Sequence, residues 1–260
     1  MGKLAHLTTV KTARTASFAY TPPAAAFEAV RILVKPTLGY AAGHPVTVSM
    51  PVMAAVLRGL RRANPNARIL IVEGQATDAS LRDIYEHSGL YDLLDDNMRL
   101  AATSDLRMQT YDNPMPIPAH FEQLEAPGYI ADYDCCISVA PFKRIVHDDQ
   151  PRLNGPLADL YELLAPGQTD RLTAMNALHD LYFTIGHHFD GTVIDLTEML
   201  KSDDERLDWG ESVHFGQVIW GDDMLAVEES VCRLTGESMP DYINSIRALR
   251  EMINTQQPQK

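Results

Sequence analysis

Charged side chains follow three apolar runs of the chain, at points where buried strands would end. Lys35 follows the first run, Glu73 the second and Lys143 the third. Open α/β sheets bind ligands at the carboxyl ends of their strands, so these side chains are candidate catalytic residues of one shared site. Two ammonium groups could hold a carboxylate or phosphate, and a carboxylate between them could move a proton or bind a metal. The alternative for each is an ordinary solvated charge at a strand end.

A loop rich in glycine follows Lys35 and leads into a predicted helix. His44 is a candidate acid, base or ligand there, and Tyr40, Thr47 and Ser49 are candidate substrate-binding residues, because backbone amides at a helix start can bind an anion. The spacing matches neither a P-loop nor a dinucleotide-binding fingerprint. Ser49 fits the role of a helix N-cap better than that of a nucleophile.

Two clusters of histidine and aspartate could hold a divalent metal. One contains His147 and Asp148, and the other contains His187 and Asp190. Imidazole and carboxylate together suit zinc, nickel or iron(II). Neither cluster has the i, i+4 pair of a helical zinc site, and the alternative is that these are buried histidines with ordinary partners.

A third group of acids lies near the predicted start of a late helix. Asp222 and Asp223 are candidate substrate-binding residues, although helix capping explains them equally well because anions are favoured at helix N-termini. Glu228 lies further along the same helix, on its polar face, and is expected to be solvated.

The apolar pattern predicts a strand–helix–strand unit at the start of the chain. Val30–Val34 and Arg68–Val72 are continuous apolar runs, and Met53, Leu57 and Leu60 recur between them at helical spacing. Continuous apolar strands linked by helices indicate a parallel sheet that is buried on both faces. We therefore expect an α/β fold, with a mostly parallel central sheet flanked by helices.

Further elements are predicted along the rest of the chain. Strands are expected over Cys135–Val139, where Ala140-Pro141 would end the strand, and over Thr192–Ile194 and Gln217–Trp220. The strand ends at positions 34, 72 and 139 are expected to lie side by side and to point the same way. The polar stretch from 144 to 156 predicts a mobile loop beside the site, with Asn154 as a candidate substrate-binding residue.

Length and composition indicate one domain. The chain has 260 residues, which we assign to a single α/β domain with an irregular insertion near positions 110–130. Residues 1–20 are expected to form an N-terminal arm or edge strand, and residues 254–260 a disordered tail. The apolar stripe of the final predicted helix, Asp241–Ile253, could pack in the core or form a homodimer.

Charge and cysteine content exclude several classes of function. The formal net charge is −13, so the chain is a poor candidate for binding nucleic acid or an anionic membrane. No run approaches the ~20 apolar residues that cross a bilayer. The three cysteines show no CxxC spacing, so no iron–sulfur cluster is expected, and their low number predicts a cytoplasmic location.

Four segments, taken in order, resemble the domain-of-unknown-function-362 family. They are VKPTLGY, PVTVSMPVMAAVLRGLRR followed by ILIVEG, ISVAPFKR, and VIWGDDMLAVEESVCRLTG. The resemblance covers most of the chain and implies an α/β protein, in a family whose members include some fused to iron–sulfur modules and for which no common reaction is known.

The chain departs from the family pattern at several positions. Thr37 stands where the family usually has asparagine, and Arg144 stands where threonine is expected, with His147 as the nearest following histidine. The family's glycine-rich stretch before the last strand is replaced by KSDDERLDWGES. A site that depends on those groups would be specialised or altered in this chain.

Three functions fit these observations. The leading hypothesis is an enzyme that acts on a small anionic metabolite at the strand ends, with Lys35 and Lys143 holding the substrate and Glu73 or His44 moving a proton. The second is a metal- or redox-dependent enzyme that uses the histidine and aspartate clusters. The third is a non-catalytic accessory or ligand-binding protein.

Overall fold

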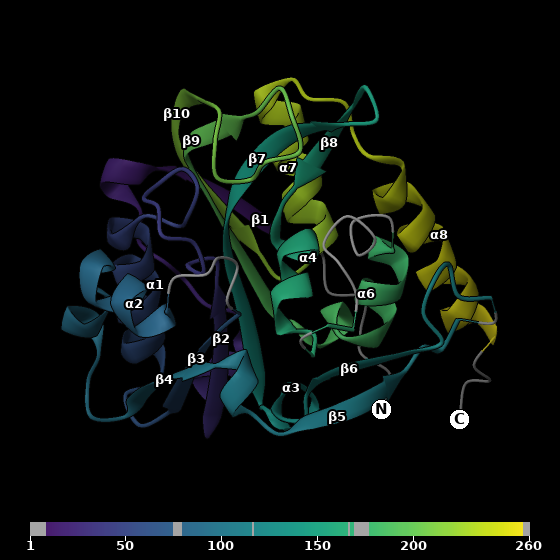
Figure 1. The fold of residues 1–260 in the computed structure, drawn as a ribbon. Helices are drawn as coiled ribbons and strands as arrows, with labels where there is room; N and C mark the ends of the chain where they lie inside the picture. The colour runs from purple at the N-terminus through teal and green to yellow at the C-terminus, as the bar shows by residue number, and fades with distance from the viewer. Residues whose placement is uncertain (1–8, 75–79, 116, 166, 169–176, 257–260) are drawn as a thin grey trace.

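The computed structural model describes residues 9–74, 80–115, 117–165, 167–168 and 177–256. Its centre is an eight-stranded sheet with the strand order β1-β10-β9-β7-β2-β3-β4, and β8 pairs with β7 outside this path. A second sheet contains only β5 and β6. Figure 1 shows the large sheet between two layers of helices.

The strands are β1 Val10–Arg14, β2 Arg31–Pro36, β3 Arg68–Glu73, β4 Met98–Ala102, β5 Met108–Asp112, β6 Gln123–Pro127, β7 Cys135–His147, β8 Gln150–Asn154, β9 Gly191–Lys201 and β10 Glu211–Gly221. The α-helices are α1 Met50–Ala63, α2 Leu81–Ser88, α3 Tyr129–Asp132, α4 Pro156–Asp159, α6 Leu178–Thr184, α7 Met224–Thr235 and α8 Asp241–Gln256. Short 3-10 helices connect them, and one of these, η5 Leu160–Leu163, continues directly from α4.

The expected α/β fold with helices on both faces of the sheet is confirmed, but the large sheet is mixed and is parallel only in its middle. Its middle is parallel, since β9, β7, β2, β3 and β4 all run the same way. The remaining pairings, β9 with β10, β10 with β1, and β7 with β8, are antiparallel. The sequence pattern identified the parallel strands because they are buried on both faces, whereas β1 and β8 are too short and polar to give that signal.

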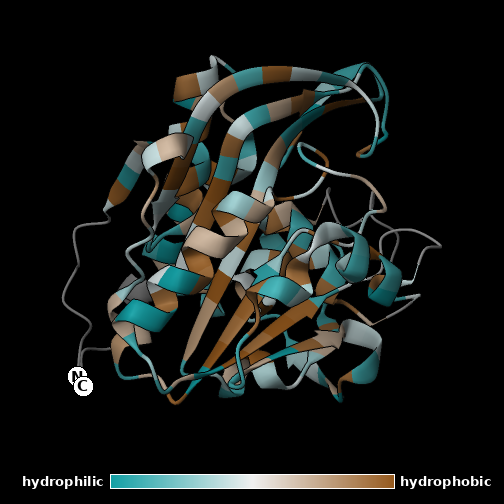
Figure 2. Ribbon diagram, turned by 90° about the vertical axis from the view of Figure 1, so that its left-hand side faces the viewer, coloured by the Kyte–Doolittle hydropathy of each residue, from teal (hydrophilic) through white to brown (hydrophobic). Residues whose placement is uncertain are grey.

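Successive residues of the central strands enter two different hydrophobic cores. Ile32 and Val34 of β2 pack with α1 and α2, whereas Leu33 between them packs with α4, α6 and α8. This alternation follows from the two-residue period of a strand. Figure 2 shows apolar residues along the central strands, so the two helix layers cover both faces of an apolar sheet.

The segment after Val139 is a long hairpin, so two predictions about it were wrong. β7 continues through Ala140-Pro141 to His147, and the stretch predicted as a mobile loop forms the end of β7, a turn and β8. Pro141 lacks a backbone N–H, and the pairing of β7 with β9 is irregular just after it, between Pro141 and Lys143. The proline therefore marks a break in the register and not the end of the strand.

The insertion predicted near positions 110–130 contains the β5–β6 pair and is organised by one buried acid. Asp180 of α6 accepts hydrogen bonds from Asn113 Nδ2 and from the backbone N–H groups of Ala119, His120 and Phe121. A carboxylate that accepts several N–H bonds is stabilised in its buried position.

Both chain ends take part in the fold as far as the structure describes them. β1 pairs with β10 as an edge strand, which is one of the two forms expected for the N-terminal arm. α8 extends to Gln256, into the predicted tail, and the rest of that tail lies outside the described residues. Ile243 and Ile246 of α8 are fully buried in the core, so packing within the chain explains its apolar stripe. Within the described residues, no helix combines the length and apolar character that crossing a membrane requires.

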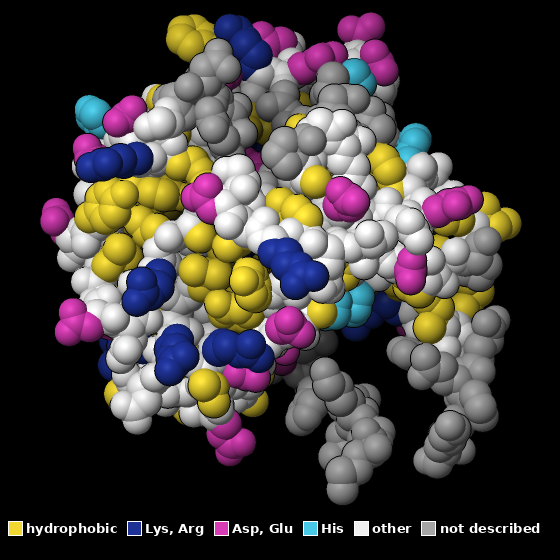
Figure 3. Space-filling model, turned by 60° about the horizontal axis from the view of Figure 1, so that its bottom comes forward, with side chains coloured by type: hydrophobic (Ala, Val, Ile, Leu, Met, Phe, Trp, Pro, Cys, Tyr) yellow, Lys and Arg dark blue, Asp and Glu magenta, His cyan; other side chains and the backbone are white. Residues whose placement is uncertain are grey.

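The amino edge of the parallel strands carries mixed charge. Figure 3 brings this edge forward and shows several Lys and Arg side chains among apolar ones, with Asp and Glu between them. This face lies opposite the edge where Lys35 and Glu73 end their strands.

We predict that Gly59→Ala destabilises the protein, although alanine is normally favoured over glycine within a helix by about 1 kcal/mol. A Cβ at Gly59 of α1 would lie 2.7 Å from the carbonyl oxygen of Tyr20 and 2.9 Å from its Cβ. Relieving that overlap should lower the free energy of unfolding by about 1–3 kcal/mol, measured by urea denaturation. Arg58→Ala, on the exposed side of the same helix, is the matched control. A stabilised Gly59→Ala variant would show that the two segments are not in close contact.

Candidate functional site

β2 and β3 end side by side, as predicted from positions 34 and 72, whereas β7 lies beside β2, passes position 139 and ends only at His147. β2 lies between β7 and β3, and Lys35 is paired with Ser138 of β7 while Val34 is paired with Ile71 of β3. Because β2 and β3 run the same way, the residues at their carboxyl ends meet at one edge of the sheet. Lys35 and Glu73 therefore belong to one site.

The ammonium group of Lys35 lies between two carboxylates. Its Nζ is 2.8 Å from Glu73 Oε1 and 2.6 Å from Glu162 Oε2, and it also donates to the carbonyl oxygen of Pro36. Lys35 and Glu73 are 1% and 0% exposed, so water contributes little to either charge. A buried ammonium needs such partners, because removing an ion from water costs several kcal/mol.

Glu162 is the member of this group that the sequence analysis missed. It lies on η5, within a segment whose other residues are mostly apolar, and it meets Lys35 across 127 positions of the chain. Asp159 lies three residues before it, and acids three residues apart share one side of a helix. Two acids at this spacing in an otherwise apolar segment could have indicated that both side chains are buried on the same side and belong to a site.

Glu73 is held from several sides. Its carboxylate accepts hydrogen bonds from the backbone N–H groups of Leu38 and Gly74 in addition to Lys35. Gly74 packs directly on η5, and a methyl group there would overlap the carbonyl oxygen and the Cβ of Glu162. The absence of a side chain at position 74 lets β3 and η5 bring their two acids to the same lysine.

A second polar group adjoins the first. Asp159 of α4 accepts hydrogen bonds from Thr37 Oγ1 and from Asn154 Nδ2, the latter at 2.6 Å. Lys143 is fully buried, and its Nζ lies 4.5 Å from the centre of the Tyr40 ring, in a cation–π contact. Thr37, which replaces the asparagine usual in the family, thus supplies a hydroxyl donor to this group.

Glu228 of α7 positions the helix that carries Asp159, and the expectation that it is solvated was wrong. It is completely buried, and its carboxyl group accepts hydrogen bonds from Leu157 N and from Tyr242 Oη, at 2.9 and 2.6 Å. Because Leu157 lies in the first turn of α4, Glu228 ties α7 to the α4–η5 segment.

Burial shifts the pKa values of these groups upward. Burial raises the pKa of Glu73 well above its ordinary value; Lys35 opposes this shift and Glu162 adds to it. Burial, with a further contribution from Glu162, raises the pKa of Asp159 to about 6 against the opposing effect of Lys143 and Lys35. Burial lowers the pKa of Lys35, but the surrounding carboxylates outweigh it and the net shift is upward. The lysine therefore stays charged, while Asp159 exchanges its proton closer to neutral pH.

The start of α1 is already occupied by an acid. Asp195 of β9 is fully buried and accepts a hydrogen bond of 2.9 Å from Ser49 N, so the anion expected at this helix start is part of the protein itself. His44 lies nearby, with Nδ1 3.0 Å from Thr47 O and Nε2 accepting from Glu198 N at 3.1 Å. Both ring nitrogens of His44 thus bind the backbone, which suits a role in holding the loop.

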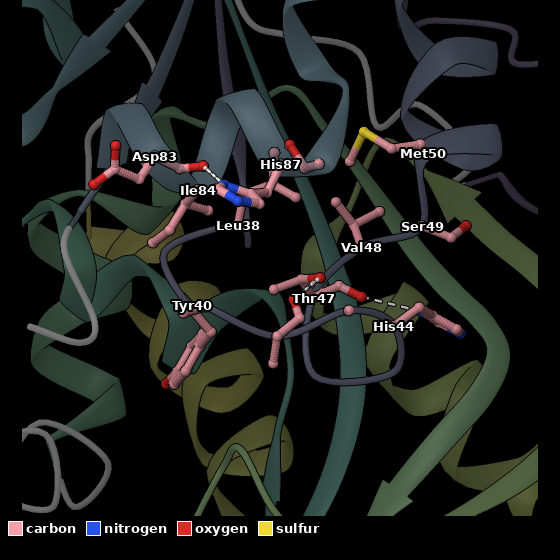
Figure 4. A pocket seen from close by; sticks show the side chains of 14 residues that line it. Leu38, Tyr40, His44, Thr47, Val48, Ser49, Met50, Asp83, Ile84 and His87 are labelled. Atoms are coloured by element: carbon pink, nitrogen blue, oxygen red, sulfur yellow. Dashed lines mark hydrogen bonds between the residues drawn. The ribbon is translucent and has the colours of Figure 1, made fainter. Parts of the chain in front are cut away.

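A cavity of about 600 Å³ lies between the β2–α1 loop and α2. Leu38, Tyr40, His44, Thr47 and Ser49 line it from the loop. Figure 4 shows Asp83, Ile84 and His87 on the facing helix α2. Tyr40 belongs both to this cavity and to the contact with Lys143, so the cavity adjoins the buried charges.

Asp222 and Asp223 do not join the site. β10 runs antiparallel to β9, so these two residues leave the sheet in the opposite direction from Lys35 and Glu73. Asp223 caps α7 through Ala226 N and pairs with Arg250 at 2.8 Å, and Asp222 accepts a hydrogen bond from Thr9 N. Their contacts match the capping interpretation.

The two predicted metal clusters lie apart. His147 ends β7, whereas Asp190 accepts a hydrogen bond from Cys136 N at the start of that strand, about 30 Å away along it. His147 contacts Glu205 and Asp148, and His187 contacts the carbonyl oxygen of Tyr182. Over the described ranges, no three His, Cys, Asp or Glu side chains are grouped so that they could hold a metal ion.

Comparison with known proteins gives a family and similarity to solved structures. The family model described as domain of unknown function (DUF362) matches residues 32–233. Among solved structures, the chain is similar to the lactate racemase apoprotein from Thermoanaerobacterium thermosaccharolyticum, with a TM-score of 0.54 and 12% sequence identity over 80% of this chain and 49% of that one. The chain thus spans about half the length of that structure, and the likeness concerns the fold alone. Comparison with curated proteins gives no match.

We predict that Lys35→Met lowers the free energy of unfolding by about 3–5 kcal/mol at pH 8, because Glu73 and Glu162 would remain buried without their cation. Urea denaturation measures the loss. Lys201→Met is the control, since the Lys201–Glu237 pair is partly exposed and should contribute at most about 1 kcal/mol. Adding Glu73→Gln to Lys35→Met should recover part of the stability. Equal losses in the two lysine variants would contradict a buried charge cluster.

We also predict that Glu228 makes the protein less stable as pH rises from about 4.5 to about 7. Burial raises the pKa of Glu228 to about 7, although hydrogen bonds from Leu157 N and Tyr242 oppose the shift. The folded state therefore holds the proton more tightly than the unfolded state. The free energy of unfolding that this proton binding contributes is present below about pH 4.5 and is lost as pH rises through the folded pKa. Between pH 5 and 8, Glu228→Gln should gain about 2–3 kcal/mol relative to the unmodified protein in urea denaturation. A pH-independent difference between the two proteins would exclude this titration.

Proposed function

The chain belongs to the DUF362 family, and we propose that it is an enzyme that acts on a small organic anion at the carboxyl edge of its parallel strands. The observation that carries this proposal is the buried Lys35 held between Glu73 and Glu162, next to a cavity of about 600 Å³. Open α/β sheets bind ligands at this edge, and clustered carboxyl groups with raised pKa values are typical of acid–base sites.

The residues take different roles in this proposal. Lys35 is saturated by its two carboxylates and Pro36, so it orients these acids and keeps their charge balanced. Glu73 is completely buried, whereas the Glu162 side chain is 6% exposed. Glu162 is therefore the better placed of the two to exchange a proton with a ligand, and Glu73 supports it.

A second cation supplies the attraction for an anion. Lys143 lies behind the ring of Tyr40, which lines the cavity, so its charge acts on that end of the cavity through a medium of low dielectric constant. Asp159, which accepts hydrogen bonds from Thr37 and Asn154, interacts electrostatically with both Lys143 and Lys35. This arrangement favours an organic acid over a neutral substrate.

The fold suggests which acids to test first. The similar solved structure is that of a lactate racemase, whose name specifies a small hydroxy acid. Short hydroxy acids and keto acids are therefore the first compounds to test on this chain. No step of the proposal passes through a metal, since the predicted ligands do not converge among the described residues.

A non-catalytic ligand-binding protein is the second candidate. One observation favours it: every hydrogen-bonding position of the Lys35 ammonium is filled within the chain, as in a purely structural ion pair. In this case the charged group would fix the β2–α1 loop and the cavity would bind a ligand unchanged.

We predict that the protein binds and converts at least one short hydroxy acid or keto acid, and that Glu162→Gln lowers the rate by about 10²-fold or more while leaving binding nearly unchanged. Calorimetry gives binding, and chiral chromatography with mass spectrometry gives turnover. Glu86→Gln, on the exposed side of α2, is the matched control. Binding without conversion would support the second candidate. Turnover that survives both Glu162→Gln and Lys35→Met would place the active site elsewhere.

A further inference from the structure

The cavity beside the charged group is too large for the shortest acids. Its volume is about 600 Å³, and cavities of roughly 300–1,000 Å³ hold ligands of drug-like size. A three-carbon acid would leave most of the walls without contacts, and an apolar wall without neighbouring atoms loses its dispersion energy. The size therefore indicates a ligand with a larger body.

The walls of the cavity are mainly apolar. Leu38 and Val48 come from the β2–α1 loop, Met50 from the first turn of α1 and Ile84 from α2. Figure 4 shows Ile84 on one side and Val48 on the other, so apolar side chains face the space from both elements. Such walls gain free energy from an apolar ligand in proportion to the area that they remove from water.

The cavity also has polar lining, with His44, Thr47 and Ser49 from the loop and Asp83 and His87 from α2. The described lining contains neither Lys nor Arg, but Lys143 Nζ lies 4.5 Å from the centre of the Tyr40 ring, and Tyr40 is part of the lining. The hydroxyl oxygen of Ser49 is buried without a hydrogen-bond partner among the described residues.

We propose that the ligand of this site is an amphipathic organic acid of about eight or more carbon atoms, with its apolar body in the cavity and its anionic end toward Tyr40 and Lys143. This inference rests on the proposed function for the anionic end, whereas the cavity itself carries the apolar body. Short hydroxy acids then bind weakly, because they reach the charged end without filling the apolar space.

A series of straight-chain carboxylates tests the proposal on the unmodified protein. Calorimetry with butanoate, hexanoate, octanoate and decanoate should show an affinity that rises roughly fourfold for each added methylene group until the cavity is full. Octanol, which has the same apolar body without the charge, should bind at least tenfold more weakly than octanoate. Turnover of short acids is measured on the same protein samples.

A variant that fills the cavity gives the second arm of the test. Ala42 lines the cavity and its side chain is exposed to it, so Ala42→Phe should weaken octanoate binding at least tenfold and leave butanoate binding within about threefold. Ala131→Phe on α3, which does not line this cavity, is the control. The chain-length series needs no variant, so it decides the matter even if Ala42→Phe fails to fold.

The outcomes separate this inference from the proposed function. An affinity that does not change with chain length overturns the inference, and conversion of short acids would leave the proposed function standing. Tight octanoate binding without conversion of any acid supports the amphipathic ligand and contradicts the enzyme. Equal affinity for octanol and octanoate would contradict the proposal that the ligand has an anionic end, and would indicate a neutral apolar ligand.

Discussion

The architecture of the site depends on one buried lysine, which is paired with two buried carboxylates. Lys35 projects from the end of β2, Glu73 from the end of β3 and Glu162 from η5, and each is nearly inaccessible to water. Neither carboxylate charge is stable there without Lys35, and the ammonium needs the carboxylates in turn, because an isolated buried charge loses its hydration without compensation. The packing of η5 against β3, with only Gly74 between them, and the tie from Glu228 to α4 follow from the need to bring these groups together.

Part of the sheet could be predicted because β2 and β3 are continuous apolar runs with a charged residue near the end of each. Lys35 and Glu73 were found in this way, and they do lie together. Glu162 and Glu228 were not found, since their partners lie far along the chain and a short helical segment does not reveal which side it buries. Glu228 shows most clearly what a helix pattern cannot predict. The pattern placed Glu228 on the polar side of its helix, but in the folded protein Tyr242 and α4 cover that side.

The β7–β8 hairpin shows how a weak local signal was misread. Asp148 and Asp149 form its turn with positive φ angles of 50° and 57°, the conformation in which a two-residue hairpin turn matches the twist of its strands. Asparagine–glycine at these positions would have been a strong signal, whereas two aspartates in a polar stretch were interpreted as a mobile loop. The hairpin extends the strand that carries Lys143 and brings Asn154 back beside Asp159.

The sequence distance between the charged partners has a consequence for how the molecule assembles. Lys35 and Glu162 are separated by 127 positions, so the balance of charge at the site exists only after both halves of the chain have docked. Contacts of such long range form late, because the entropy of closing the intervening loop must be overcome first. During synthesis on the ribosome, the first half emerges with its lysine and glutamate still hydrated, and the cluster can close only after Glu162 has been added.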